Sequence, residues 1–295
     1  MGFSISAGEI FGLSCSLVWA VNSLMVRTQS QAIPPAMMNG IRCAVATVFF
    51  WAMLPFGPPL SSYSLVTGTE WALLVGGLLI GMAVGETMYL AAIKEIGVSR
   101  AMALSGTFPL STFFFEWALL QNPFSRRFFL GICLVTAGVV FLSRRARESA
   151  GERPERLALG VLLALFACVL WGLSTVMLKP AIANMTSVQA NSVRVPLSAA
   201  VLFLARAWAG PVMRIRDVDR RALLVVAASG IVGVGAGSLL YVMAIDRIGP
   251  AKMATLASVS PVLGLLMSVI FLKEKLTLPL VAGVILCVGG VWMVL

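Results

Sequence analysis

The chain has 295 residues, of which 59% are hydrophobic and only 12% are charged, and its mean hydropathy is +0.97. A soluble domain carries roughly 25% charged residues because its surface faces water, so we expect most of this surface to face lipid. The net charge of +10 is spread in short clusters between apolar runs, which argues against nucleic-acid binding, and the sequence has no histidine for a Ser-His triad or a histidine metal site.

Ten apolar segments follow one another along the chain. A helix needs roughly 20 apolar residues to cross a bilayer core of about 30 Å. The segments that meet this requirement run over 8–26, 35–54, 70–92, 100–120, 127–143, 157–177, 187–208, 221–243, 251–272 and 278–295. The first lacks a basic leader and a cleavage site, so it is predicted to be a span and not a signal peptide. The predicted fold class is an all-α integral membrane protein with ten transmembrane helices.

The two halves of the chain align without a gap when 152 is added to each residue number. Matched pairs occur in all five pairs of spans, among them Trp19 and Trp171, Asn39 and Asn191, Arg42 and Arg194, Gly81 and Gly233, Tyr89 and Tyr241, Pro109 and Pro261, and Gly138 and Gly290. We therefore predict one repeat over 1–143, a basic linker over 144–156 and a second repeat over 157–295. Five spans is an odd number, so the second repeat enters the membrane inverted, an architecture typical of secondary transporters.

The basic residues predict the orientation. Loops on one side of the membrane hold fifteen Lys and Arg residues, and loops on the other side hold five. The positive-inside rule places the fifteen-residue side, including 144–156, in the cytoplasm and both termini outside. The expected location is the inner or plasma membrane of the cell.

Four charged residues lie inside the predicted spans and away from their first and last few residues: Arg42, Glu86, Glu116 and Arg194. Such residues are costly in a membrane and usually pair in the interior of the helix bundle. Their depths predict that Arg42 pairs with Glu86 and Arg194 with Glu116. These pairs could simply fix the helix register. The alternative is that Glu86 titrates and couples substrate movement to protons.

Two prolines, Pro109 and Pro261, lie in the middle of the fourth and ninth spans. Each removes a backbone hydrogen bond and frees a carbonyl group, at Ser105 and Ala257 respectively. A kink that serves packing alone is one interpretation. The symmetric placement favours a second, in which the breaks face a cavity.

Polar and aromatic residues near these features are the candidates for a substrate cavity. Trp and Tyr are usually interfacial anchors, but the tryptophans of the first and sixth spans lie beside polar residues. The candidate set is Trp19, Asn22, Glu86, Tyr89, Ser105, Trp171, Ser174, Ser238, Tyr241 and Ser258. Glycines spaced four apart in the third span, at 77, 81 and 85, and in the eighth, at 233 and 237, predict close helix packing.

Three motifs carry a resemblance to a known family. They are LVWAVN at 17–22 with VLWGLS at 169–174, YLAAIKEIG at 89–97 with YVMAIDRIG at 241–249, and a mid-helix proline followed by LKEKLT at 272–277. In these features the chain resembles the EamA-like branch of the drug/metabolite transporter superfamily over essentially its whole length. The first repeat departs from the pattern at 120–125, where LQNPFS replaces the acidic loop motif. The resemblance implies a ten-helix basket of two inverted repeats, with a central cavity lined mainly by spans one, three, four, six, eight and nine.

These features predict a secondary transporter, specifically an exporter of amino acids or similar small polar metabolites by alternating access. Proton coupling and exchange are both open, as are a monomer and a homodimer. The expected partners are a small-molecule substrate, the lipid bilayer and protons as a candidate coupling ion; no cofactor or metal is expected. The alternative is a membrane protein that binds or flips a lipid-linked or amphipathic intermediate, as a lipid carrier or a drug efflux protein. An enzyme is disfavoured because the sequence shows no nucleophile–base pair and no metal set.

Overall fold

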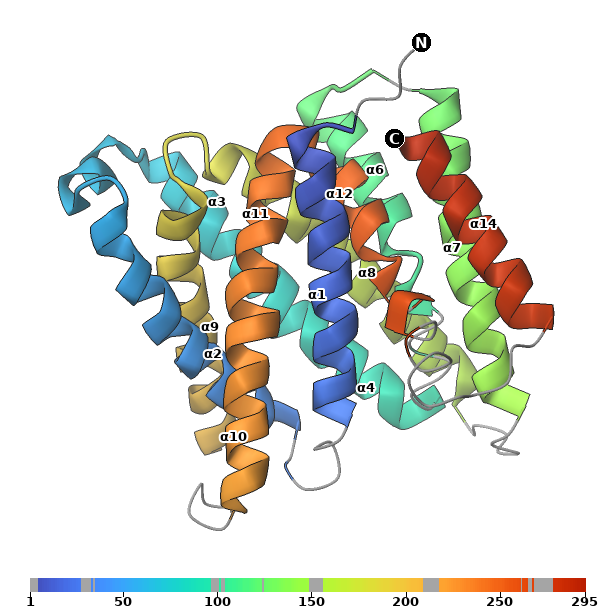
Figure 1. Ribbon diagram of the computed structural model, residues 1–295, viewed down its shortest axis with the longest axis horizontal. Helices are drawn as coiled ribbons and strands as arrows, with labels where there is room; N and C mark the ends of the chain where they lie inside the picture. The colour runs from blue at the N-terminus through green and yellow to red at the C-terminus, as the bar shows by residue number, and fades with distance from the viewer. Residues whose placement is uncertain are drawn as a thin grey trace.

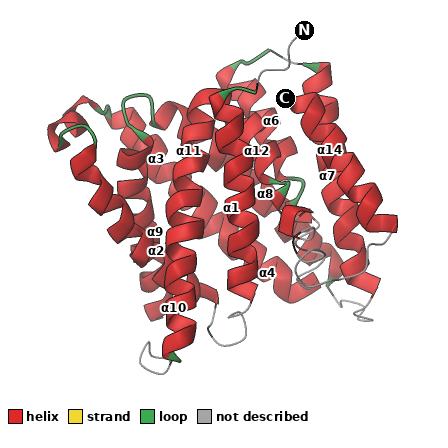
Figure 2. Cartoon of the chain, in the orientation of Figure 1, coloured by secondary structure: helices red, strands yellow, loops and turns green. Residues whose placement is uncertain are grey.

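The described part of the chain folds almost entirely into helices (Figures 1 and 2). The computed structural model describes residues 5–27, 33, 35–96, 101, 104–123, 125–148, 156–208, 218–260, 262–264, 267 and 278–295, and these contain no strand. The long helices run roughly side by side, some in front of others in this view, and both ends of the chain lie at the same edge of the molecule (Figure 1). We call this edge the terminal side.

The first repeat comprises α1 (Ala7–Arg27), α2 (Pro35–Met53), α3 (Gly68–Leu78), the π-helical η3 (Leu79–Gly85), α4 (Glu86–Ile96), α6 (Phe108–Leu120) and α7 (Arg126–Glu148), with two short 3-10 helices, η1 (Leu54–Phe56) and η2 (Leu60–Leu65). The second repeat comprises α8 (Leu157–Ala181), α9 (Ser187–Trp208), α10 (Arg220–Ser229), the π-helical η5 (Gly230–Ala236), α11 (Gly237–Ile248), α12 (Pro250–Ala257) and α14 (Leu278–Val294). The third span is therefore α3, η3 and α4 in succession, and the eighth is α10, η5 and α11. Helix α7 extends to 148, into the predicted linker 144–156, of which 149–155 lie outside the described residues.

Local signals explain where several helices begin. Thr67 and Glu70 form a reciprocal capping box at the start of α3, each side chain accepting from the other's backbone N–H. Asp219 accepts from two backbone N–H groups at the start of α10. Between α11 and α12 the chain turns at Gly249, whose φ of +83° suits glycine.

Lengths and surfaces fit a membrane. Five helical stretches in the described chain are long and apolar enough to cross a bilayer, namely Met37–Phe56, Gly68–Tyr89, Leu157–Ala181, Ser187–Ala205 and Arg220–Ile248, and two shorter apolar helices cover Phe108–Leu120 and Val281–Val294. Large apolar side chains such as Val48, Leu162 and Ile285 are more than 60% exposed. Exposed apolar surface on many helices is expected where lipid, and not water, surrounds the protein. The predicted all-α membrane architecture is confirmed.

The two repeats are inverted. A Cβ placed on Gly8, at the start of α1, would touch Ile248 at the end of α11. Lys179, near the end of α8, forms an ion pair of 3.0 Å with Asp246, also at the end of α11. The first helix of repeat 1 therefore begins on the side of the membrane where the first helix of repeat 2 ends.

The first helix of each repeat packs against helices of the other repeat. Helix α1 packs against η5, α11 and α12 of the second repeat, and α8 packs against α3, η3, α4 and α6 of the first. The pairs α2–α9 and α7–α14 lie at opposite ends of the molecule (Figure 1). The centre of the molecule is therefore formed by helices of both repeats.

The α7–α14 pair depends on glycines because its backbones are in contact. A Cβ on Gly131 would lie 2.8 Å from the carbonyl oxygen of Gly290, and a Cβ on Gly290 would lie 2.6 Å from that of Gly131. Cys287 donates to the carbonyl of Val135, 152 residues earlier, at 3.6 Å. Small residues that allow such close approach are the usual means of helix pairing in lipid.

Replacement of Gly290 by alanine is expected to destabilise the protein by about 1–3 kcal/mol, because the added methyl group meets backbone atoms that cannot rotate away. The neighbouring Gly289 provides the matched control, since a Cβ there has no atom within 4 Å. Gly289→Ala is expected to be neutral or slightly stabilising. Thermal unfolding of the two purified variants in the same detergent tests this, and equal melting temperatures would contradict it.

Candidate substrate cavity

Two π-helical segments stand at matching places in the repeats, in the middle of the third and eighth spans. Segment η3 covers Leu79–Gly85 and η5 covers Gly230–Ala236. A π-turn holds one residue more than an α-turn and widens the backbone spiral, and such turns are frequent at functional sites. Both segments are rich in glycine, so partner helices can come close to their backbones.

A tryptophan from the other repeat is hydrogen-bonded to each π-helical segment. Trp19 of α1 donates its indole N–H to the carbonyl of Gly233 at 3.1 Å, and Trp171 of α8 donates to the carbonyl of Gly81 at the same distance. The two bonds are related by the 152-residue shift. They anchor the first helix of each repeat to the third span of the other.

The glycine spacing noted in the sequence serves these contacts. A Cβ on Gly81 would lie 2.4 Å from the hydroxyl of Ser174, and a Cβ on Gly237 would lie 2.4 Å from the indole nitrogen of Trp19. Ser174 also donates to the carbonyl of Gly77 at 2.7 Å. The stripe of small residues is therefore explained by close packing between the repeats.

Tyrosines complete the two aromatic pairs. The rings of Trp19 and Tyr241 lie 5.3 Å apart between centroids, and those of Trp171 and Tyr89 lie 5.1 Å apart. The Tyr241 hydroxyl is 3.0 Å from that of Thr175. Both pairs again follow the shift of 152, and each joins one repeat to the other.

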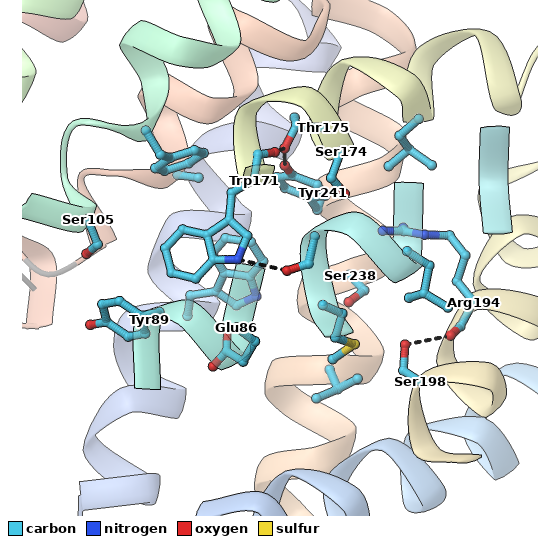
Figure 3. A pocket seen from close by; sticks show the side chains of 18 of the residues that line it. Glu86, Tyr89, Ser105, Trp171, Ser174, Thr175, Arg194, Ser198, Ser238 and Tyr241 are labelled. Carbon is cyan, nitrogen blue, oxygen red and sulfur yellow. Dashed lines mark hydrogen bonds between the residues drawn. The ribbon is translucent and has the colours of Figure 1, made fainter. Parts of the chain in front are cut away.

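These pairs line a cavity of about 540 Å³ between the repeats (Figure 3). Nine of the ten residues predicted from the sequence to face a cavity lie on its wall: Trp19, Glu86, Tyr89, Ser105, Trp171, Ser174, Ser238, Tyr241 and Ser258. The tenth, Asn22, does not line it. The wall is mixed in character, with apolar and aromatic side chains interrupted by hydroxyl groups and charges, as in sites for small polar ligands.

The predicted pair of Arg42 and Glu86 is wrong. The Arg42 guanidinium donates instead to the side-chain oxygens of Asn22, at 3.2 Å, and Asn39, at 3.3 Å. Arg42 lies outside the cavity wall, whereas Glu86 lies on it. Arg42 and Glu86 lie at similar depths in their predicted spans, but their side chains leave the two helices in different directions.

The predicted pair of Arg194 and Glu116 is also wrong. Glu116 accepts from the backbone N–H of Ala251, in the first turn of α12, and from the amide of Asn122 at 2.6 Å. A carboxylate at a helix N-terminus satisfies unpaired N–H groups and the helix dipole. Glu116 therefore joins the end of α6 to the start of α12, while Arg194 lies on the cavity wall.

The fourth span is broken, and the break comes just before Pro109. The helix ends in a turn at Gly106 and Thr107, and α6 starts at Phe108 with Pro109 in its first turn, where a missing N–H is tolerated. A turn at 258–259 repeats this break in the second half. Pro261 lies outside the described residues.

Sequence reasoning missed the contribution of the seventh span. Helix α9 places Asn191, Arg194, Val195 and Ser198 on the cavity wall. The sequence predicts an ion pair for Arg194 and presents Asn191 only as the match of Asn39. The signal that could have found them is the comparison of the repeats, because Asn22, which holds Arg42, is replaced by serine in the second half.

Contacts between the repeats also occur on the terminal side. The Lys252 ammonium of α12 forms an ion pair with the buried Glu9 of α1. The Arg247 guanidinium of α11 lies 4.8 Å from the ring centroid of Phe11 on α1. These charged contacts hold the start of α1 against the second repeat.

Comparison with known proteins agrees with this architecture. The sequence pattern of the EamA-like transporter family matches residues 6–144 and again residues 158–295. The chain belongs to the EamA-like transporter family. It is thereby a member of the drug/metabolite transporter superfamily and a multi-pass membrane transporter.

Individual relatives are distant but match over nearly the full length. The chain is 25% identical to an uncharacterized transporter of Archaeoglobus fulgidus over 97% of each chain. It is 23% identical to the uncharacterized transporter YvbV of Bacillus subtilis, over 94% of this chain and 88% of that one. A crystal structure with 21% identity superposes with a TM-score of 0.82 over 99% of this chain and 98% of the other, which shows that the fold is shared.

Replacement of either anchoring tryptophan by phenylalanine is expected to lower the stability of this EamA-like transporter by about 1 kcal/mol, because one hydrogen bond between the repeats is lost. For a domain of this size that corresponds to a fall in melting temperature of roughly 2–4 °C. Trp117→Phe is the control, because Trp117 is 48% exposed on α6. Thermal unfolding of Trp19→Phe, Trp171→Phe and Trp117→Phe provides the comparison; an equal loss in the control would show that ring volume, and not the hydrogen bond, matters.

Proposed function

We propose that this EamA-like transporter is a secondary active transporter that exports amino acids or similar small polar metabolites by alternating access. The observation that carries the proposal is the cavity of about 540 Å³ at the junction of the two repeats, whose wall combines aromatic rings with hydroxyl and charged groups. Such a wall suits a ligand that has both a polar and an apolar part. The cavity is large enough for an amino acid and is built from both halves.

The inverted repeats support alternating access. Two halves of the same topology can exchange roles, so that a site between them opens first to one side of the membrane and then to the other. On the terminal side, the pair Glu9–Lys252 joins the start of α1 to α12 and would hold this side closed in one of the two states. A shift of 152 carries Glu9 to Val161 and Lys252 to Arg100, so this ion pair has no equivalent on the opposite side. The state closed to one side of the membrane would then differ from the state closed to the other side in its ion pairs, and not in the arrangement of its helices.

The proposed orientation of the protein in the membrane, on which the direction of transport depends, follows from the charges in the loops. The basic side is assigned to the cytoplasm and the terminal side to the exterior, as the positive-inside rule requires. In that orientation the contacts of α1 with α11 and α12 would include those that close the cavity to the outside. With its outer side closed, the cavity would be open to the cytoplasm and could bind a cytoplasmic substrate for export.

Proton coupling is proposed to run through Glu86, the carboxylate on the cavity wall. A proton and a cationic substrate group would compete for the same carboxylate, so that binding one releases the other. The other ionisable groups on the wall are Tyr89 on the same helix, Tyr241 on α11, Arg194 on α9 and Cys43 on α2. Exchange of internal for external substrate is the alternative mode and needs no titrating group.

Reconstitution in liposomes tests the transport function. Vesicles loaded with unlabelled amino acids and placed in a radiolabelled amino-acid mixture should take up label by counterflow, above the level of protein-free vesicles. Movement of fluorescent phospholipid between leaflets without counterflow would instead favour the lipid-binding or lipid-flipping function.

The Glu86→Gln variant is expected to lose accumulation of label driven by a pH gradient, because the amide cannot exchange a proton. Glu95→Gln, at the end of the same helix α4 and outside the cavity wall, is the matched control and should retain it. Uphill uptake is measured in the same vesicles with an imposed pH difference. Persistent gradient-driven accumulation by Glu86→Gln would rule out Glu86 as the coupling group.

A further inference from the structure

The cavity wall is only partly symmetric between the two repeats. Most of its aromatic wall comes in matched pairs, such as Trp19 with Trp171 and Tyr89 with Tyr241. Symmetric pairs serve the framework and the motion that both halves share. Charges that occur in one half and not in the other are the features that distinguish one ligand from another.

Arg194 is the first asymmetric feature. Its counterpart, Arg42, is held by two side-chain oxygens and lies off the cavity wall. One of these oxygens belongs to Asn22, whose counterpart is Ser174, and the Ser174 hydroxyl is engaged with a backbone carbonyl. In the described part of the chain the guanidinium of Arg194 has no hydrogen bond and no ion pair, and it lies on the cavity wall.

Glu86 is the second asymmetric feature. Its counterpart is Ser238, so only the first repeat places a carboxylate at this level of the cavity. Neither ion pair found among the described residues includes Glu86. Figure 3 shows the side chains of Glu86 and Arg194 apart from each other, Glu86 on α4 of the first repeat and Arg194 on α9 of the second.

Asn191 adds an unsatisfied acceptor beside Arg194. Its side chain is fully buried, and its amide nitrogen donates to the backbone carbonyls of Ser187 and Ser238 at 3.0 and 3.2 Å. Its side-chain oxygen is buried with no partner among the described residues, yet Asn191 lies on the cavity wall. An unpaired buried oxygen is costly, and a donor supplied by a ligand would satisfy it.

Unpaired charges inside a membrane are expensive unless a ligand completes them. A ligand with one charge would satisfy either Arg194 or Glu86 and leave the other uncompensated. We propose, on the basis of the transport function above, that the cavity selects dipolar ligands, whose anionic group binds Arg194 and whose cationic group binds Glu86. A free α-amino acid has both groups, and the aromatic and apolar wall receives its side chain.

Matched probes test this selection. L-Serine, L-leucine and L-phenylalanine are each compared with the amine and the acid that lack one of the two charges: ethanolamine and 3-hydroxypropionate, 3-methylbutylamine and 4-methylpentanoate, phenethylamine and 3-phenylpropionate. Binding to the purified full-length protein is measured by thermal shift and by competition in counterflow. At least one of the dipolar probes is expected to bind tenfold or more tightly than both of its singly charged analogues.

Variants assign each end of the ligand. Arg194→Gln is expected to weaken binding of the dipolar probe at least tenfold and to favour the amine, whereas Glu86→Gln should weaken it similarly and favour the acid. Arg42→Gln is the symmetry-matched control, because Arg42 lies off the wall, and it should preserve the preference of the wild type even if the protein is less stable. The opposite preferences of the two cavity variants cannot arise from a common folding defect.

The outcomes separate this inference from the proposed function. Transport or tight binding of a singly charged analogue equal to that of its dipolar parent would overturn the dipolar selection while leaving the transporter in place. Failure of all three dipolar probes to bind would overturn it as well. Lipid movement without counterflow would remove the proposed function itself.

Discussion

The structure depends on one interaction that occurs twice: an indole N–H bound to a glycine carbonyl within a π-helical segment. Trp19 and Trp171 each cross from one repeat to the other to make it. Each accepting glycine leaves no room for a Cβ, which would lie 2.4 Å from Ser174 on Gly81 and 2.3 Å from Asn22 on Gly233. Because both first helices are anchored in this way, the repeats interlock, and the space that remains between the anchors is the cavity. The aromatic pairs on its wall extend the same contacts.

Much of the fold can be predicted from the sequence, because span lengths, the internal repeat and matched polar residues are visible in the order of the residues alone. Apolar length gives the spans, and the 152-residue shift gives the duplication and, with five spans to a repeat, the inversion. The cavity candidates can be found because aromatic and polar residues interrupt apolar helices at matching positions. Asn22 shows the limit: it sits one turn from Trp19 on α1, but its oxygen is turned to Arg42 and away from the cavity.

The charge pairs could not be predicted because depth is only one of the coordinates that place a side chain. The direction in which it leaves the helix also matters, and a π-turn changes that direction. One extra residue in a turn rotates all later side chains by about 100° relative to a continuous α-helix. Glu86 follows directly after η3, so an extrapolation along an ideal helix misplaces it. Nothing in the residue types of 79–85 distinguishes a π-segment from an α-helix.

Duplication explains how a symmetric framework can carry an asymmetric site. A gene copied in tandem starts with identical halves, so each functional residue is present twice, at inverted positions. In this chain the first half has Asn22, which binds Arg42, where the second half has Ser174, and Arg194 lies on the cavity wall. The first half has Glu86 where the second half has Ser238, so only one half contributes a carboxylate at this position. Both tryptophan anchors keep their hydrogen bonds in spite of these differences. The cavity wall can therefore differ between the two halves while the interlocked helices keep the same arrangement.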